Sequence, residues 1–355
     1  MKLRTALSRE TDAVARGREL GTAFAPQYAQ TAALYVAHFS ELGIGARDVR
    51  TIAERSRTAL EAWAPDLAAE SDAIADAAGI ERWRLAAVGA RTEILAVAPP
   101  RVGECSTAVR VGAGVAAESL QTWDWHDFLV PEALLVEFRA TSGLDVKLFT
   151  EFGTPGKIGV NSAGVGLHFN ILSHESDSAA GGVPVHAVAR RVLDEARSVD
   201  DAHRIAASAA VSASTVLTVF DSNGSESRAM ALELSPAGMG VVEPGPDGWL
   251  FHTNHFLDPM LSEGDTMSDE TTAVRLAHLD GVRAELTGLE PTARALAACG
   301  GHGAAAEICM TPDPTLPRLD QWATLLTVAV DTEGFALEVF PGRPDEAAAA
   351  GLARF

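Results

Sequence analysis

The sequence predicts an α+β fold, a four-layer αββα sandwich in which two β-sheets pack face to face and helices cover both outer faces, with a helical N-terminal segment. Three observations support this prediction. Residues up to about Ala98 show helical spacing, strand-like segments dominate the middle of the chain, and helical and strand-like segments then follow one another. No Ser/Gly-rich or Pro-rich linker separates these regions, so we expect one compact unit.

The N-terminal segment is expected to be helical because Ala, Leu, Glu and Arg prevail and apolar residues recur at helical spacing, as they do between Ala33 and Phe39. Pro65 interrupts the pattern, which resumes from Asp72 to Ala98. Pro99-Pro100 then ends helix propagation, since proline lacks an amide donor and disfavours a helical residue before it. Strands are expected after this proline pair.

The predicted strands contain β-branched and aromatic residues in alternation, and turns rich in Gly, Asp or Ser separate them. One pair of strands flanks Asn161-Ser162-Ala163-Gly164, which predicts a hairpin. Strands are expected at Ser106–Val111, Gln121–Trp125, Glu132–Arg139, Asp145–Phe152, Lys157–Val160, Val165–Ile171, Ser214–Phe220, Met230–Leu234, Trp249–His252, Leu325–Asp331 and Ala336–Phe340. Later helices are expected at Val185–Arg197, Asp200–Ala210 and Thr266–Gly288.

Composition and charge narrow the class of partner. Hydrophobic residues make up 47% of the 355-residue chain and charged residues 21%, which is ordinary for a globular protein with a full core. The net charge of −20 at pH 7 disfavours binding to DNA, RNA or anionic lipid, because a polyanion would be repelled over most of the surface. We therefore expect a small-molecule partner, with no nucleic acid and no membrane.

The chain is expected to be cytoplasmic. Its first residues include charges such as Lys2 and Glu10 and no apolar h-region, so no secretory signal is expected. No run approaches the ~18 apolar residues that a membrane helix needs. Its three cysteines, Cys105, Cys299 and Cys309, cannot form an all-paired disulfide framework and suit a reducing compartment.

Cys105 is the strongest candidate for a catalytic nucleophile. It lies in Gly103-Glu104-Cys105-Ser106-Thr107, just before a strand-like segment. If the peptide bond between Glu104 and Cys105 breaks, the new α-amine, with a pKa of about 7.7 to 8.0, can serve as base for a thiol whose ordinary pKa is about 8.5. The alternative is that Cys105 is simply a small buried apolar residue, as free cysteines often are.

Four motifs occur in order along the chain. They are Glu104-Cys105-Ser106-Thr107, Gln121-Thr122-Trp123-Asp124-Trp125, Gly156-Lys157-Ile158-Gly159-Val160-Asn161-Ser162-Ala163-Gly164 and His252-Thr253-Asn254-His255-Phe256. In this order they resemble the isopenicillin N acyltransferase family, the peptidase C45 group of autoproteolytic N-terminal-nucleophile (Ntn) hydrolases. The similarity runs from about residue 15 to Gly342-Arg343-Pro344.

The chain also departs from the pattern of that family. Glu104 precedes the cysteine where the family usually has Gly, and Thr122 precedes the tryptophan where the family has Asn. The family places a small hydroxyl residue close before a late Arg. Here Val274 directly precedes Arg275, and Thr272 lies a little upstream.

The resemblance implies an αββα fold of the Ntn-hydrolase type that cleaves itself between Glu104 and Cys105. Residues 1–104 would form a helical pro-segment or small chain and residues 105–355 the catalytic chain, and the two would stay associated. The mature Cys105 would form an acyl-enzyme from a small amide or acyl thioester and pass the acyl group to water or an amine. No cofactor is implied, although acyl-CoA could be the acyl donor.

The same resemblance implies roles for two further groups near the nucleophile. Asp124 would orient Cys105 and its new α-amine by charge-assisted hydrogen bonding. Strand alternation places Trp123 and Trp125 on the opposite face from Asp124, and we expect both rings to contact the substrate. The alternative for Asp124 is a surface position on an edge strand.

Two later positions complete the expected site. Asn254 would donate a side-chain N–H to the oxyanion of a tetrahedral intermediate, and the alternative is a turn Asn that bonds its own backbone. Arg275 would hold a carboxylate, either that of Asp124 or one on the substrate, and the alternative is a solvated surface charge. Thr272 is expected to contact the substrate.

No metal site is expected. One group of candidate ligands is His168, His174, His252 and His255, and the other is Cys299, His302 and Cys309. The first lacks a His-Glu-x-x-His helix and the second lacks a clear fourth ligand. Lys157 is expected at the entry to a hairpin strand and not in a phosphate loop, because Ile158 stands where Ser or Thr would bind magnesium.

Three functions remain open on these residues. The first is the autoprocessed amidohydrolase or acyltransferase, with hydrolysis and acyl transfer both possible. The second is a non-catalytic binding protein in which Glu104 blocks cleavage. The third is a thiol hydrolase that never cleaves itself and uses a histidine, such as His126, as the base for Cys105.

Overall fold

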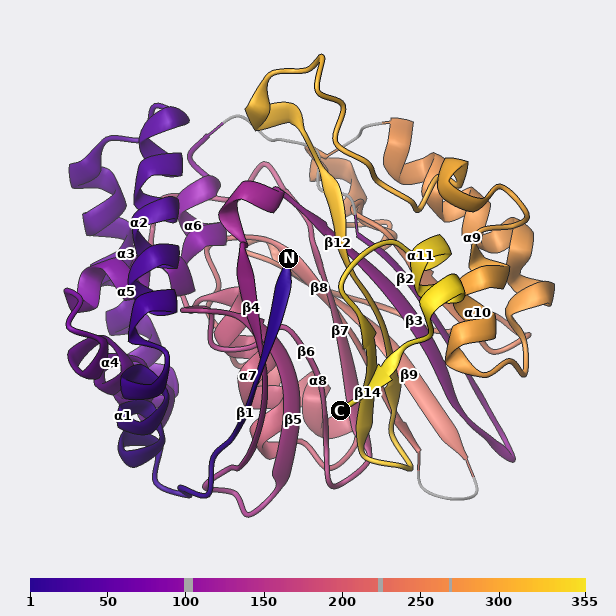
Figure 1. The fold of residues 1–355 in the computed structure, drawn as a ribbon, viewed down its shortest axis with the longest axis horizontal. Coiled ribbons are helices and arrows are strands. Elements are labelled where there is room, and N and C mark those ends of the chain that lie inside the picture. Colours follow the sequence, from indigo (N-terminus) through magenta and orange to yellow (C-terminus); the bar gives the residue numbers. More distant parts are fainter. Residues whose placement is uncertain (99–104, 223–225, 268–269) are drawn as a thin grey trace.

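The computed structural model describes residues 1–98, 105–222, 226–267 and 270–355, which form two β-sheets with helices around them (Figure 1). The larger sheet has the strand order β1 (Lys2–Leu7), β4 (Glu132–Arg139), β5 (Asp145–Glu151), β6 (Ile158–Asn161), β7 (Val165–Ile171), β8 (Thr215–Ser222), β9 (Ser227–Ser235) and β10 (Gly238–Val242). The smaller sheet has the order β11 (Trp249–His252), β2 (Ser106–Gly112), β3 (Val115–Trp125), β12 (Ala323–Asp331), β13 (Ala336–Phe340) and β14 (Ala353–Arg354).

The helices fall into three groups by position. The N-terminal group is α1 (Ala13–Ala23), α2 (Ala25–Glu41), α3 (Ala46–Trp63), α4 (Pro65–Ala78), α5 (Arg82–Gly89) and α6 (Arg91–Leu95). The larger sheet is covered by α7 (Val185–Glu195) and α8 (Val199–Ala207). The smaller sheet is covered by α9 (Glu270–Leu286), α10 (Pro291–Ala298) and α11 (Pro344–Ala350). Short 3-10 turns occur at Asp127–Leu129, Ser262–Gly264, Gly303–Ala305 and Arg318–Asp320.

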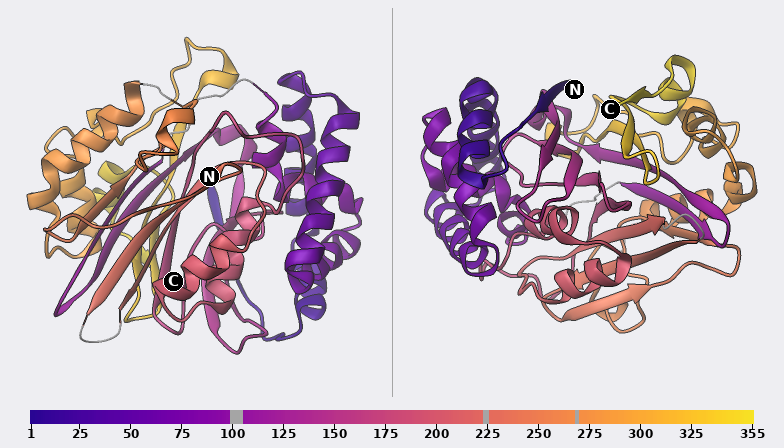
Figure 2. Two further views of the ribbon diagram at one scale, coloured as in Figure 1. Left: turned by 180° about the vertical axis from the view of Figure 1, so that it is seen from behind. Right: turned by 90° about the horizontal axis from the view of Figure 1, so that it is seen from below.

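The main apolar core lies between the two sheets, and each sheet contributes alternate residues to it. In the larger sheet Phe149 joins this core, whereas its neighbour Leu148 packs with the outer helices. In the smaller sheet Val109 joins the core and its neighbour Ala108 packs with the helices on the other side. This alternation follows from the two-residue period of a strand. The predicted four-layer αββα sandwich is therefore confirmed, and Figure 2 shows the helices on both sides of it.

The structure corrects the predicted elements in several places. Strand β1 lies in the segment that was expected to be entirely helical, and it pairs in parallel with β4, with Lys2 opposite Glu132. A parallel partner so far along the chain leaves no hairpin signal in the sequence. Strand β3 begins at Val115 and not at Gln121. Strands β10 and β14 and helices α10 and α11 are additional elements that the sequence analysis missed.

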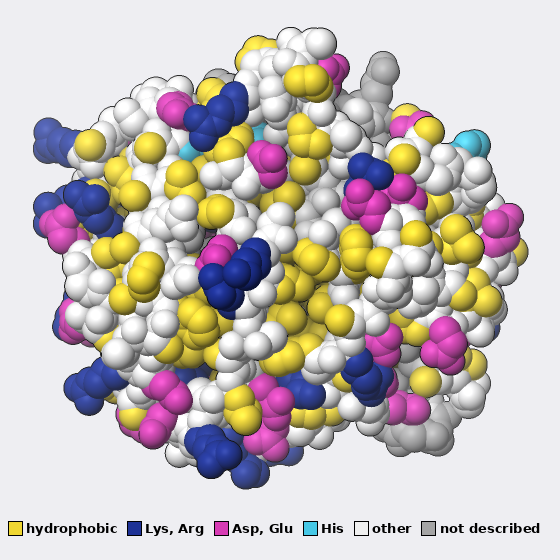
Figure 3. Space-filling view, viewed as in Figure 1, with side chains coloured by type: hydrophobic (Ala, Val, Ile, Leu, Met, Phe, Trp, Pro, Cys, Tyr) yellow, Lys and Arg dark blue, Asp and Glu magenta, His cyan; other side chains and the backbone are white. Residues whose placement is uncertain are grey.

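The N-terminal helices stand at one side of the sandwich, beside the edge of the larger sheet (Figure 1). Tyr35 and Phe39 on α2 are fully buried and join the core between the sheets. None of the helices in the described ranges is long and apolar enough to cross a membrane. On the face drawn in Figure 3, acidic and basic side chains lie next to one another and do not separate into regions of one sign.

Buried polar contacts join the N-terminal helices to the sandwich. Arg190 on α7 donates to Glu70 on α4 at 3.0 Å. The Tyr35 hydroxyl donates to the Glu151 carboxylate at 2.6 Å, and Arg91 on α6 donates to the same carboxylate at 2.8 Å. Because all of these groups are buried, removing either carboxylate would leave uncompensated positive charge in the core.

Glu93 lies at this interface and should make the free energy of unfolding depend on pH. It is fully buried on α6 and accepts a hydrogen bond from the backbone N–H of Val185, 2.8 Å away at the start of α7. Burial raises the pKa of Glu93 from 4.5 to about 7. Between these values the folded chain keeps a proton that the unfolded chain has lost, so this group lowers the free energy of unfolding as the pH rises.

We expect Glu93→Gln, which keeps the acceptor and removes the titration, to flatten this dependence. Relative to the variant, the parent should lose up to ~3 kcal/mol of unfolding free energy between pH 4.5 and pH 7. Urea denaturation at both pH values, with Cys105→Ala in both chains so that neither can cleave itself, measures the difference. If the unfolding free energy changed equally with pH in the parent and in Glu93→Gln, the raised pKa assigned to Glu93 would be wrong.

Candidate active site

Cys105 lies directly before β2, an inner strand of the smaller sheet between β11 and β3. Strand β2 runs antiparallel to both β3 and β11, so its first residue lies beside their last residues. Ser106 pairs with Thr122 on β3. This register brings Asp124, near the end of β3, and Asn254, just after β11, to either side of Cys105.

The backbone of Cys105 is held from both sides. Its N–H donates to Asn254 Oδ1 at 2.8 Å, and its carbonyl oxygen accepts from Arg275 Nη1 at 2.7 Å. Its Sγ lies 3.9 Å from the carbonyl oxygen of Asp124. The four residues expected to be catalytic therefore come together from four different parts of the chain.

A small cavity surrounds the thiol. It is lined by Arg91, Cys105, Trp123, Asp124, Trp125, Lys157, Phe169, Ile171 and Asn254. Both tryptophans that were expected to contact the substrate are among these residues. Asp124 is only 1% exposed, so the alternative of a surface position is wrong. Cys105 also packs in the core between the sheets, as the apolar alternative proposed.

Asn254 presents its oxygen to Cys105, whereas the sequence analysis expected it to act through its N–H. Its Oδ1 accepts from the Cys105 N–H and from Arg275 Nη2, the latter at 3.1 Å. Its Nδ2 donates to the carbonyl oxygen of Ile171 at 2.8 Å. In the intact chain the carboxamide is thus a bridge between the Cys105 backbone and the Arg275 guanidinium.

Thr272 and Arg275 lie on the same helix, α9, and both form hydrogen bonds with Asn254. The Thr272 hydroxyl accepts from the backbone N–H of Asn254 at 2.9 Å. Thr272 is not among the described residues that line the cavity around Cys105, so it positions Asn254 and does not face the thiol. Arg275 is 1% exposed, so its alternative assignment as a solvated surface charge is wrong.

The Cys105 thiol is protonated in the intact chain. Burial, followed by the nearby Asp124 carboxylate, raises the pKa of Cys105 to about 12, and Lys157 and Arg275 only partly oppose this. A thiol in this state is a poor nucleophile, because the thiolate is the reactive form. Glu104, on the other side of the expected scissile bond, lies outside the described residues.

Lys157 and Glu151 are site residues that the sequence analysis missed. Lys157 does enter the hairpin strand β6 as expected, but its side chain is fully buried beside the thiol cavity. Its Nζ lies 2.5 Å from Glu151 Oε1 and 3.8 Å from the centre of the Trp123 ring. Burial lowers the pKa of Lys157 to about 7. Its place in the motif Gly156-Lys157-Ile158-Gly159 was the available signal.

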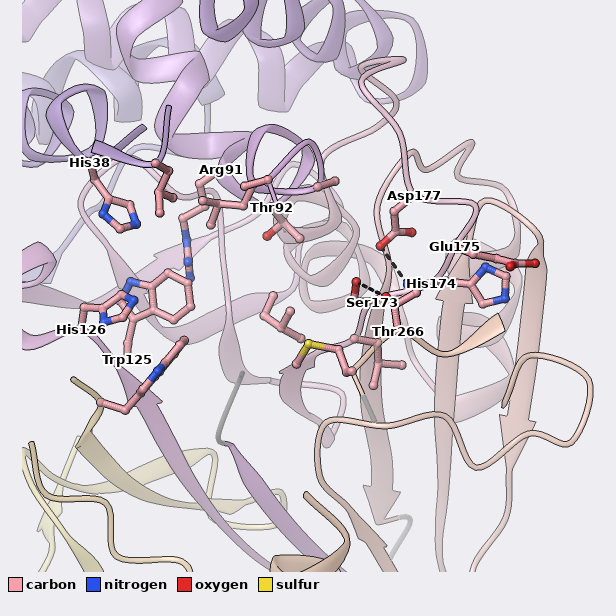
Figure 4. Close-up of a pocket in the computed structure, with 18 residues that line it drawn as sticks. His38, Arg91, Thr92, Trp125, His126, Ser173, His174, Glu175, Asp177 and Thr266 are labelled. Carbon is pink, nitrogen blue, oxygen red and sulfur yellow. Dashed lines mark hydrogen bonds between the residues drawn. The ribbon is translucent and has the colours of Figure 1, made fainter. Parts of the chain in front are cut away.

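Figure 4 shows a second, larger cavity, which has a volume of about 230 Å³. Arg91, Trp125 and Ile171 line both cavities and mark their junction. His126, the base in the third functional alternative, lines the larger cavity but is not among the described residues around the thiol. Its Nδ1 lies 2.8 Å from the Gln321 carbonyl oxygen.

The remaining candidate ligands are dispersed. His252 Nε2 lies 2.7 Å from Glu233 Oε1, and both side chains are fully buried. Cys299 and Cys309 are buried free thiols in the core beneath α9 to α11. Within the described ranges, no three His, Cys, Asp or Glu side chains gather so that they could hold a metal ion.

Comparison with known proteins finds similarity to the family that the sequence motifs resemble. The family model described as acyl-coenzyme A:6-aminopenicillanic acid acyl-transferase matches residues 119–290. A curated relative, the 40 kDa form of acyl-coenzyme A:6-aminopenicillanic-acid-acyltransferase from Emericella nidulans, is 29% identical over 185 residues, covering 50% of this chain and 49% of that protein. The chain therefore spans about half the length of this curated relative. The predicted resemblance to the isopenicillin N acyltransferase family is confirmed.

Two solved structures are also similar. Penicillin V acylase from Agrobacterium tumefaciens gives a TM-score of 0.37 at 14% identity, covering 67% of this chain and 83% of that one. The Caenorhabditis elegans orthologue of N-acylethanolamine-hydrolyzing acid amidase gives a TM-score of 0.43 at 11% identity, covering 64% and 93%. The family match includes Asp124, Asn254 and Arg275, whereas Cys105 precedes it.

Proposed function

We propose that this relative of the acyl-transferase family is a cysteine Ntn hydrolase that activates itself by cleavage before Cys105 and then transfers or hydrolyses acyl groups. One observation carries the proposal. The backbone N–H and C=O of Cys105 are each held by a side chain, Asn254 on one side and Arg275 on the other. Two buried polar side chains therefore fix the backbone of Cys105, and Asn254 holds the nitrogen of the bond that is proposed to break.

In the cleavage step, Sγ of Cys105 attacks the carbonyl carbon of Glu104 and the bond from that carbon to the Cys105 nitrogen breaks. The thiol proton passes to the leaving nitrogen, which becomes an amine, and a thioester joins Glu104 to Cys105. Water then hydrolyses the thioester, which frees the thiol and leaves a carboxylate on Glu104. Asn254 Oδ1, 2.8 Å from the nitrogen, is positioned to hold the new amine.

In the mature enzyme the α-amine of Cys105 takes the thiol proton and Sγ attacks the carbonyl of an amide or an acyl thioester. Asp124 orients the amine by a charge-assisted hydrogen bond. For the predicted oxyanion role, the Asn254 carboxamide turns so that Nδ2, now on Ile171, faces the substrate oxygen. The acyl group then passes to water or to an amine, with acyl-CoA as one possible donor and no cofactor.

The two chains, residues 1–104 and 105–355, are proposed to stay associated after cleavage. The contacts of Glu70 with Arg190 and of Tyr35 and Arg91 with Glu151 all cross this division and are buried. We also propose a reducing compartment such as the cytoplasm, because the chain's three cysteines are free thiols.

The purified chain is expected to separate into two fragments on a denaturing gel, and Edman sequencing of the larger fragment should begin at Cys105. Intact mass of the pair should equal that of the chain plus one water. The two fragments should elute together from a sizing column under native conditions. A chain of unchanged mass after long incubation across pH 5 to 9 would overturn the proposal.

A non-catalytic binding protein is the second candidate, and one observation favours it. Burial raises the pKa of the uncut Cys105 thiol to about 12, which disfavours the thiolate form. This candidate predicts a single band, no burst of acyl product from an activated ester, and ligand binding that is unchanged in Cys105→Ala.

A further inference from the structure

We propose that Lys157 is the base that activates Cys105 for self-cleavage, before the α-amine of Cys105 exists. The proposal rests on the proposed function, because it concerns the cleavage step that this function requires. A mature N-terminal nucleophile uses its own α-amine as base, but in the uncut chain the nitrogen of Cys105 is an amide that donates to Asn254. The first cleavage therefore needs a base from elsewhere in the chain.

Lys157 lies on the wall of the cavity that surrounds the thiol. Its side chain and that of Cys105 both line this cavity, which has a volume of about 10 Å³. A general base acts on a proton within hydrogen-bond reach or through one water molecule, and ~10–15 Å³ accommodates one water. Both side chains are buried, so bulk water does not compete for the proton of the thiol.

Two contacts hold the Lys157 amine in place. Its Nζ lies 2.5 Å from Glu151 Oε1 and 3.8 Å from the centre of the Trp123 ring. Glu151 ends β5 of the larger sheet, and Trp123 belongs to β3 of the smaller sheet. The amine is therefore fixed between the two sheets, at the cavity into which the thiol opens.

The charges around Lys157 favour loss of its proton. The Glu151 carboxylate also accepts from Arg91 Nη2 at 2.8 Å and from the Tyr35 hydroxyl at 2.6 Å. Because Arg91 alone balances the charge of Glu151, a protonated Lys157 adds a second buried positive charge beside one carboxylate. Burial, opposed by Glu151 and assisted by Arg91, lowers the pKa of Lys157 to about 7, so the free amine is present near neutral pH.

The other titratable groups around the thiol fit this role less well. Besides Glu151, Arg91 and Tyr35, they are Asp124, Arg275 and His186. An ordinary carboxylate has a pKa of about 4, so a group such as Asp124 is a weaker base for a thiol than an amine is. Arg275 stays charged and accepts no proton. His186 is not among the described residues that line the thiol cavity.

The proposed step keeps every proton within the chain. The free Nζ of Lys157 takes the thiol proton as Sγ of Cys105 bonds to the carbonyl carbon of Glu104. The bond from that carbon to the Cys105 nitrogen then breaks, and Lys157 gives the proton to this nitrogen, which becomes the α-amine. A thioester now joins Glu104 to Sγ, and Lys157 is a free amine again. In the mature enzyme the α-amine replaces Lys157 as base.

The pH dependence of cleavage in the parent tests the proposal without any substitution. The uncut chain is made by cell-free synthesis and followed on denaturing gels from pH 4.5 to 9. We expect the rate to rise about tenfold per pH unit up to about pH 7 and to level off above it, because only the free amine accepts the proton. A rate that is level from pH 5 upward would assign the base to a carboxylate. A rate that still rises tenfold per unit at pH 9 would mean that the thiol ionises without Lys157. Either result would overturn the proposal.

Substitutions separate a base from a fixed positive charge. Lys157→Met should slow cleavage about 10²- to 10⁴-fold, the usual contribution of a general base. Lys157→Arg keeps the charge but does not release its proton, so it should be equally slow. The matched control is Lys147→Met, because Lys147 lies near the rings of Phe335 and Phe355 and is not among the described residues that line the thiol cavity. It should cleave as the parent does. Cleavage at the parent rate by either Lys157 variant would overturn the proposal.

Turnover by the cleaved chains distinguishes a base from a residue that only supports the site. Lys157→Met chains that have cleaved, however slowly, should hydrolyse an acyl p-nitroanilide within about tenfold of the parent rate, because the α-amine then acts as base. Loss of turnover as large as the loss of cleavage would show a general disturbance and overturn the assignment. If Lys157→Met does not fold, the pH profile of the parent decides. If the parent cleaves but Lys157→Met cleaves equally fast, the proposed function stands and only the base is wrong, whereas a parent that never cleaves overturns both.

Discussion

Replacing Cys105 with alanine should leave the 37.2 kDa chain uncut and abolish acyl chemistry. The same sulfur is proposed to break the bond to Glu104 and to carry the acyl group, so a single substitution removes both steps. Loss of a nucleophile of this kind costs on the order of 10⁴- to 10⁶-fold in kcat. Cleavage is followed by intact mass, and turnover by release of p-nitroaniline from an acyl anilide.

The matched control is Cys299→Ala. Cys299 is also a fully buried free thiol, but it lies in the core beneath α9 to α11, away from the cavity around Cys105. It should cleave itself and turn over substrate as the parent does. Cleavage or turnover by Cys105→Ala, or their loss in Cys299→Ala alone, would contradict the assignment of Cys105 as nucleophile.

The layers of the fold could be predicted because each depends on local periodicity. Alternation within strands determines that Phe149 and Leu148 face opposite layers, and this pattern is visible in the sequence. Strand β1 could not be predicted in the same way. It is a strand only because β4 offers an edge to pair with, and that edge is formed by residues more than a hundred positions away.

The site shows the same division. The motifs indicated Cys105, Asp124 and Asn254, the family's late Arg indicated Arg275, and the structure brings these four together. The motifs did not indicate which atom of Asn254 faces the nucleophile, because that depends on the carbonyl oxygen of Ile171 on another sheet.

Arg91 shows most clearly what local patterns leave out. In the sequence it is one of many arginines in helical segments, with nothing to mark it as buried. Its burial depends on Glu151, sixty positions later, and on the Trp125 ring. Buried charges of this kind are defined by long-range partners, so only the folded chain shows them.

Asn254→Asp should separate the two proposed roles of this residue. Aspartate keeps an oxygen at the position that accepts from the Cys105 N–H and from Arg275, so self-cleavage should proceed within about tenfold of the parent rate. It lacks the N–H that is proposed to stabilise the oxyanion during turnover. We therefore expect kcat/KM of the mature enzyme to fall about 10²- to 10³-fold, or about 2.7 to 4 kcal/mol.

The new carboxylate is also a buried charge, and its general cost must be measured apart from the lost donor. Asn170→Asp is the matched control, since Asn170 is equally buried on β7 and is not among the described residues that line either cavity. If Asn170→Asp loses stability but keeps kcat/KM while Asn254→Asp loses kcat/KM and still cleaves, the N–H of Asn254 acts in turnover alone. If Asn254→Asp turns over substrate at the parent rate, the oxygen is the only functional atom of this carboxamide. The oxyanion must then be stabilised by other donors, of which the Arg275 guanidinium is already beside Cys105.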